Sequence, residues 1–139
     1  MTILDEDFKE LPKNNERQFG MSAHLMGLFG CLFSIGGLII TTLYYFGNRT
    51  KSSFVREHCA RALNFQIVYF LISSMIQIGL LYGIIFKSEI SVDDFKNTTS
   101  KLYIFGGLSF LNLVLCVRSA IAANKGEIWR NPITINFVK

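Results

Sequence analysis

The sequence predicts an all-α membrane protein, a compact bundle of three transmembrane helices. Three apolar stretches, residues 21–46, 63–86 and 102–123, are each long enough as helices to cross a hydrocarbon core, which takes roughly 20 residues. Half of the 139 residues are hydrophobic and only 17% are charged. Too little polar sequence remains to shield three such helices from water. We therefore expect a multi-pass protein of the cell membrane.

The chain divides into a polar N-terminal tail, residues 1–15, and one transmembrane helical domain, residues 16–139. The tail is acidic and contains Pro12, which predicts either a disordered segment or a short helix at the membrane interface. The first span is not a cleavable signal peptide, because about twenty polar residues precede it and its apolar core is too long.

Small residues recur along the first span at intervals of three and four positions. On a straight helix they all lie within about 40° of one line, and small residues on one face let membrane helices approach closely. We predict a helix-packing face, against the protein's own helices or a second copy. Gly36 and Gly37 are adjacent, however, and could break this span into two half-helices. The face comprises Ala23, Gly27, Gly30, Ser34, Gly37 and Thr41.

The second and third spans carry polar side chains where lipid would penalise them. Gln66, Ser73 and Gln77 fall on one side of the second span, and Asn112 lies in the third. Such groups must face protein, water or one another. They either form hydrogen bonds that hold the helices together or line a polar path for a small solute.

The connections predict two further features. Ser91 to Asp94 have the pattern of a helix N-cap, so we expect a short helix in the second loop, ending near Lys96. After the third span, Asn124 to Gly126 is typical of a helix stop. Apolar and polar residues then alternate over 133–137, which favours an extended segment at the membrane interface.

Charge gives a weak orientation signal. The net charge is +4. With three spans, the first loop and the C-terminus share one side and hold eight Lys and Arg residues, against six on the side of the tail and second loop. This slight excess favours the first loop and C-terminus in the cytoplasm. The basic surface suits anionic lipid headgroups. The sequence lacks the alternation of aromatic and basic residues that would indicate binding to nucleic acid.

Catalytic and metal-binding patterns are lacking in the sequence. His24 and His58 begin successive spans and would lie on opposite sides of the membrane, so we expect no shared metal site. No catalytic triad, phosphate-binding glycine loop or metalloprotease motif is present. The three cysteines match neither a disulfide framework nor a zinc pattern. We expect no cofactor and no enzyme activity.

Two motifs flank the last two spans, Ala62-Leu63-Asn64-Phe65-Gln66 and Asn124-x-Gly126-Glu127-x-x-Arg130-x-Pro132. Through them the chain resembles small bacterial membrane proteins of a domain-of-unknown-function family. That family is distantly similar to the twenty-kilodalton component of the chloroplast inner-envelope protein translocon. The resemblance implies a compact helical membrane domain, with no activity to carry over. The plastid component has four spans, whereas this sequence shows three.

We expect the two motif segments to touch, with Glu127 or Asn64 pairing with Arg130, Arg61 or His58. The polar cluster that would fix the fold or bind a partner comprises His58, Arg61, Asn64, Gln66, Asn124, Gly126, Glu127, Arg130 and Pro132.

Two functions follow from these patterns. The first is a non-catalytic subunit that binds another membrane protein, or itself, within the bilayer. The second is a small-solute conduit or carrier that acts as an oligomer. The first is favoured because three short spans hardly enclose a path and no inverted repeat is visible.

Overall fold

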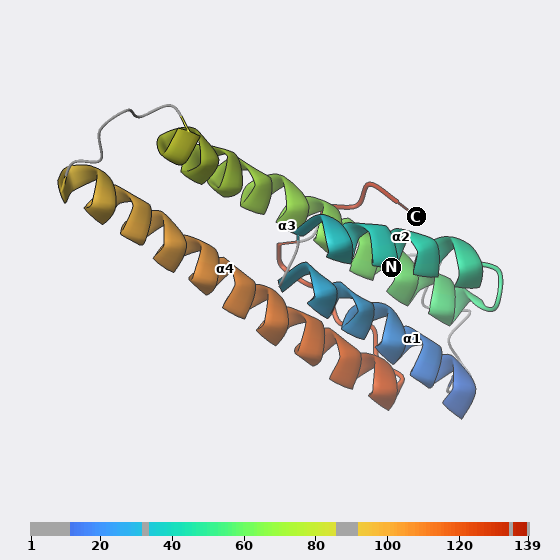
Figure 1. Cartoon of the computed structure of the whole chain (residues 1–139). Helices are drawn as coiled ribbons and strands as arrows, with labels where there is room; N and C mark the ends of the chain where they lie inside the picture. The colour runs from blue at the N-terminus through green and yellow to red at the C-terminus, as the bar shows by residue number, and fades with distance from the viewer. Residues whose placement is uncertain (1–11, 32–33, 86–91, 134, 139) are drawn as a thin grey trace.

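The computed structural model describes residues 12–31, 34–85, 92–133 and 135–138, and this part of the chain is helical, with no strand. Its elements, in chain order, are α1 (Asn14–Met26), the 3₁₀ helix η2 (Gly27–Cys31), α2 (Ser34–Asn48), α3 (Ser53–Ile85) and α4 (Val92–Lys125) (Figure 1).

The first apolar stretch folds back on itself. α1 and η2 form one arm and α2 the other, and the arms lie side by side (Figure 1). Near the turn, a Cβ atom built on Gly37 would lie 2.6 Å from the Cα of Gly30. At the open end, the Tyr44 hydroxyl donates to the Phe19 carbonyl at 3.2 Å. We call this unit the α1–α2 hairpin.

The prediction of a first transmembrane helix over 21–46 is therefore wrong, and so is the predicted position of its break. The helix ends at η2, whereas Gly36 and Gly37 lie inside α2. Hydropathy does not detect this reversal, because two antiparallel arms packed on the protein need the same apolar residues as one straight span.

Two helices, α3 and α4, are long and apolar enough to cross a membrane. Their candidate spans are Ser53–Tyr82 and Thr98–Lys125, with mean hydropathies of 1.6 and 1.8. Only 28% of the most apolar window of each is buried, whereas the core helix of a soluble protein would be mostly buried. Exposed side chains include Met75 and Tyr103, at 75% and 77%. Lipid, rather than water, suits such a surface.

Among the residues described from Val92 on, no separate short helix ends near Lys96. α4 begins at Val92 and continues through Lys96 to Lys125, so the acidic residues after Ser91 belong to its first turn. Ser91 itself lies outside the described residues. A cap signal marks where a helix starts but not how far it runs.

The predicted helix stop after Ala123 is confirmed. Gly126 has a φ of +82°, a left-handed conformation that glycine adopts without strain. Its N–H donates to the Ala123 carbonyl at 3.0 Å, and the Glu127 N–H donates to the Ala122 carbonyl at 2.9 Å. This pair of bonds is the Schellman motif, which satisfies the last carbonyls of α4.

The α1–α2 hairpin packs against one half of α3 and α4, and the two long helices extend beyond it (Figure 1). α1 and α3 begin at the same end of the molecule at which α2 and α4 finish. The start of α1 therefore shares this end with the first loop and with the end of α4. The tail and the second loop are expected on one side. Residues 1–11 and 86–91 lie outside the described residues, but the helices that follow them, α1 and α4, begin at opposite ends of the molecule.

Candidate functional site

The tip of the hairpin closes around the Gln66 amide of α3. A Cβ atom on Gly27 would lie 2.5 Å from Nε2 of Gln66, and one on Gly30 would lie 2.6 Å from its Oε1. A Cβ on Gly37 would meet both the Gly30 backbone and Oε1 of Gln66, at 2.6 and 2.8 Å. We call this set the glycine–Gln66 contact. Only residues without a side chain allow both arms to approach the amide so closely.

All six residues of the predicted packing face are buried, although they now lie on two arms. Ala23, Gly27 and Gly30 are on the first arm, and Ser34, Gly37 and Thr41 are on the second. Ser34 accepts a hydrogen bond from Nε2 of Gln77 at 3.0 Å. The neighbours of these residues are helices of the same chain, which is one of the two partners that the sequence left open.

The residues of the predicted polar path are hydrogen-bonded in separate groups. Nε2 of Gln66 donates to Oδ1 of Asn112 at 3.2 Å. Ser73 donates to the Phe70 carbonyl of its own helix at 3.2 Å, and Gln77 bonds Ser34 of α2. Oε1 of Gln66 is buried without a hydrogen-bond partner in the described structure. It faces the Cα atoms of the glycines, which offer only weak C–H donors.

Two more polar contacts join α3 to α4, and the sequence did not single them out. The Tyr69 and Ser109 hydroxyls lie 3.1 Å apart, and Nζ of Lys101 donates to the Gly79 carbonyl at 3.2 Å. In the sequence, a tyrosine or lysine in an apolar run is typical of an anchor at the membrane interface. Only the structure, which shows its hydrogen-bond partner on the other helix, identifies it as a contact between α3 and α4.

The two histidines meet, which corrects the expectation that they lie on opposite sides of the membrane. Nε2 of His24 and Nδ1 of His58 are 3.1 Å apart, in a buried contact between α1 and α3. The Phe54 ring packs on His58 with a centroid distance of 4.4 Å. Nε2 of His58 has no partner among the described residues. No group of three or more potential metal ligands occurs in this part of the chain.

Asn64 holds the C-terminal segment on α3. Its Oδ1 accepts the N–H groups of Phe137 and Val138 at 3.1 and 2.8 Å, and its Nδ2 donates to the Val138 carbonyl at 2.8 Å. Asn64 thus binds the chain a few residues beyond the second motif, and the predicted pairs of Glu127 or Asn64 with Arg130, Arg61 or His58 do not occur among the contacts of the described residues. Arg61 instead forms an ion pair with Glu57 on its own helix, at 2.6 Å.

The rest of the predicted polar cluster is spread over the molecule. His58 and Gln66 are buried in the contacts described above, and Gly126 ends α4. Four members are exposed at or after the end of α4: Asn124, Glu127, Arg130 and Pro132.

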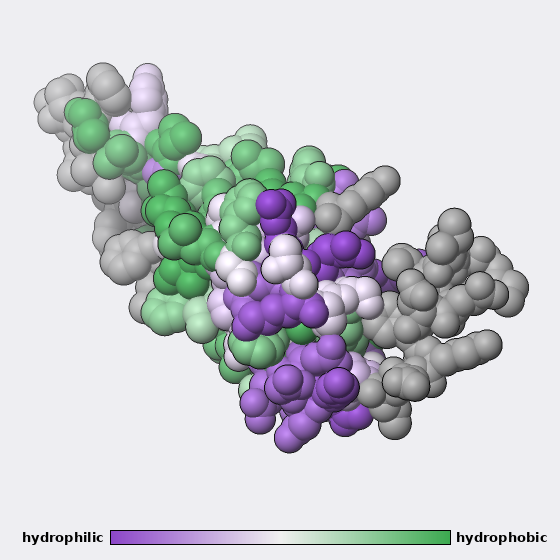
Figure 2. Space-filling model, turned by 90° about the vertical axis from the view of Figure 1, so that its right-hand side faces the viewer, coloured by the Kyte–Doolittle hydropathy of each residue, from purple (hydrophilic) through white to green (hydrophobic). Residues whose placement is uncertain are grey.

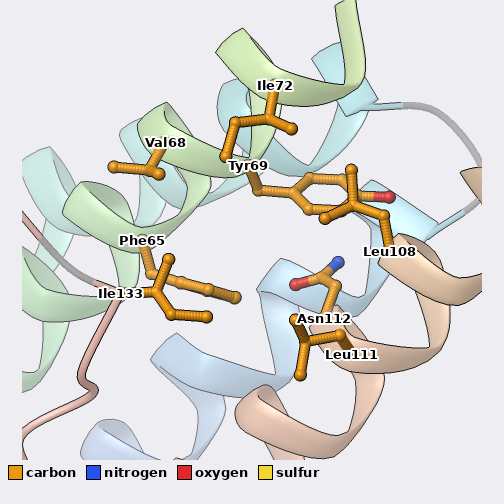
Figure 3. A pocket seen from close by; sticks show the side chains of 8 residues that line it. All are labelled: Phe65, Val68, Tyr69, Ile72, Leu108, Leu111, Asn112 and Ile133. Carbon is orange, nitrogen blue, oxygen red and sulfur yellow. The ribbon is translucent and has the colours of Figure 1, made fainter. Parts of the chain in front are cut away.

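A small apolar crevice lies between α3 and α4 beside these contacts (Figure 3). Its volume is about 20 Å³, room for about one water molecule. Ile133 reaches it from the C-terminal segment, and the Asn112 amide lies at its edge. Its other lining residues are Phe65, Val68, Tyr69, Ile72, Leu108 and Leu111.

Together the fold and its contacts define a class: an all-helical protein with two helices long and apolar enough to span a membrane and a folded-back helical hairpin packed against them. A family model, that of the magnetosome magnetite crystal formation proteins (MamF/MmsF), matches residues 15–138. The chain belongs to this family. No curated protein and no solved structure matches it.

The family match overturns the resemblance to the unknown-function family and to the chloroplast translocon component. The motifs that suggested it contain residues with local structural roles here. Asn64 binds backbone groups and Gly126 ends a helix. Such roles recur in unrelated helical proteins, so short motifs of this kind did not identify the family.

Proposed function

We propose that this chain is a non-catalytic integral protein of the magnetosome membrane and acts in magnetite crystal formation as a partner of another membrane protein or of a second copy. The observation that carries the proposal is the family match, which extends over residues 15–138. The exposed apolar surfaces of α3 and α4 support placement in a membrane.

The hydrogen bonding of the interior favours a structural role for its polar groups. The Gln66 amide bonds Asn112, the Gln77 amide bonds Ser34, and Asn64 bonds backbone groups. Each of these bonds joins two segments of the bundle. A conduit would instead need polar groups arranged along a water-filled route.

The proposed function is tested by deleting the gene in its magnetosome-forming host and restoring it. Deletion should change the number or diameter of the magnetite crystals seen by electron microscopy, and the wild-type gene should restore them. Unchanged crystals in the deletion strain would refute the proposal.

A second variant separates a structural role from a conduit. Gln66→Met with Asn112→Leu keeps the approximate volume of both side chains but removes the amides. If the amides only hold helices together, the variant should restore the crystals whenever it reaches normal levels in the membrane. Loss of crystals at a normal level of folded protein would favour the conduit. The matched control, Asn136→Ala, changes an exposed amide.

A further inference from the structure

One end of the molecule carries most of the described positive charge. It is the end where α1 and α3 begin and α2 and α4 finish. Contacts join its parts: Nζ of Lys51 lies 3.3 Å from the centre of the Phe19 ring, and a Cβ on Gly126 would lie 3.1 Å from Pro12. We call it the basic end, and its cations are Lys13, Arg17, Arg49, Lys51, Arg56, Arg61 and Lys125.

Few acidic groups offset this charge. The described acidic residues of the basic end are Glu16, Glu57 and Glu127. Glu57 pairs with Arg61, and the Glu16 carboxylate accepts the backbone N–H of Lys13. Figure 2, which looks onto this end, shows hydrophilic residues gathered there and hydrophobic residues on the part of the molecule behind.

The opposite end is not basic. The connection between α3 and α4 and the first turns of α4 contain Lys87, Lys96 and Lys101 against Glu89, Asp93 and Asp94 in the sequence. One of these lysines already donates to a carbonyl of α3. The excess of positive charge is thus confined to one end of the two long helices.

Aromatic rings place the basic end at the level of lipid headgroups. The Arg49 guanidinium lies 5.0 Å from the centre of the Phe46 ring. Lys51 covers Phe19 in the same way. Aromatic rings and long basic side chains occur together at membrane interfaces, because the rings reach into the apolar region while the charges stay in water.

We propose that the basic end docks on the anionic phospholipid headgroups of the cytoplasmic leaflet, so that the start of α1 and the end of α4 lie on the cytoplasmic side. Charge complementarity selects the lipid: exposed lysines and arginines near a bilayer attract anionic headgroups. The same excess selects the side, because cytoplasmic segments of membrane proteins are enriched in lysine and arginine.

The folded-back hairpin makes this topology geometrically consistent. Three crossings would put the two ends of the chain on opposite sides. With α1 and α2 as a hairpin, α3 and α4 are the two described helices that cross, so the end of α3 and the start of α4 lie on the other side. This inference does not depend on the role in crystal formation, because it concerns charge and topology alone.

The first test is the topology of the full-length protein. Green fluorescent protein and alkaline phosphatase are fused in turn to each terminus and inserted within residues 86–91. Both terminal fusions should fluoresce without phosphatase activity, and the internal phosphatase insertion should be active. Termini that report opposite sides would overturn the proposal, as would phosphatase activity at both.

The second test uses Trp129, the single tryptophan of the chain, which packs against Leu115 and Cys116 in the half of α4 nearer the basic end. The protein is reconstituted in phosphatidylcholine vesicles with phosphatidylglycerol, and one or the other lipid carries bromine on its acyl chains. At equal mole fraction, brominated phosphatidylglycerol should quench Trp129 at least twofold more strongly. High salt should remove the difference, because screening shortens the reach of charges to about 3 Å at 1 M.

Variants connect the quenching to the basic end. Arg49→Gln, Lys51→Gln and Arg56→Gln, combined, remove three exposed cations and should abolish most of the preference. The control, Lys87→Gln with Lys96→Gln, removes cations from the opposite end and should leave it unchanged. Equal quenching by both brominated lipids in the wild-type protein would overturn the proposal. So would equal effects of the two sets of variants.

Discussion

Two glycines of α2 should respond in opposite directions to the same substitution. Gly37 lies in the glycine–Gln66 contact, where an added Cβ would sit 2.6 Å from the backbone of Gly30. Gly47 lies near the end of the same helix, and a Cβ there would have no neighbour within 4 Å. Alanine at the two positions therefore separates the cost of the close approach from the general effect of replacing a helical glycine.

The magnitudes follow from these surroundings. Alanine is favoured over glycine in a helix by about 1 kcal/mol, and this gain applies to both positions. At Gly37 the new methyl group meets backbone, which yields less readily than the end of a side chain, so we expect an overpacking cost near 3 kcal/mol. Gly37→Ala should then lower the free energy of unfolding by about 2 kcal/mol. Gly47→Ala should raise it by up to about 1 kcal/mol.

The assay is thermal unfolding of the purified protein in a mild detergent, followed by circular dichroism. For a chain of this length, the loss at Gly37 corresponds to a fall in Tm of roughly 6–8 °C. The Tm of Gly47→Ala should stay the same or rise. If both variants raised the Tm equally, the two arms would not pack as closely as the structure shows, and the hairpin would be in doubt.

Three further changes test the polar contacts. Asn64→Ala should speed removal of the C-terminal residues by carboxypeptidase, because three hydrogen bonds are lost. The control Asn136→Ala should leave the rate unchanged, and equal rates for the two variants would contradict the role of Asn64 in holding the C-terminal segment. In a double-mutant cycle, Gln66→Ala and Asn112→Ala should show a coupling of about 0.6 kcal/mol, and strict additivity would argue against their bond. Lys101→Met should lower the free energy of unfolding by about 1 kcal/mol, measured by chemical unfolding. An unchanged free energy of unfolding would argue against the hydrogen bond from Lys101 to α3.

The second and third predicted spans correspond to α3 and α4, but the first does not form a span, and the difference is physical. Apolar length predicts how much chain can be buried in lipid, and this is a local property. Whether a stretch crosses or turns back depends on what packs against it. Gly30 and Gly37 are ordinary helix-packing residues in the sequence, and only their contact with each other and with Gln66 shows that the arms are antiparallel.

The histidine pair shows the same limit. His24 and His58 are 34 positions apart, and the three-span interpretation placed them on opposite sides. The reversal at η2 returns α1 to the start of α3 and brings the rings together. The pairing therefore could not be predicted without the hairpin. The partners of Asn64 were equally unpredictable from the sequence, because they are backbone groups of residues 73 and 74 positions away.

The sequence by itself determined the helical class, the apolar surfaces, the small-residue face and the stop at Gly126, because each depends on residue type and spacing along one helix. Tertiary structure decided the fold-back of the first apolar stretch, the partners of the buried polar groups and the gathering of charge at one end. These depend on which segments meet, and residues such as Gln66 and Asn64 carry no sign in the sequence of the neighbour that satisfies them. The family, in turn, came from the match over residues 15–138 and from neither spacing nor fold.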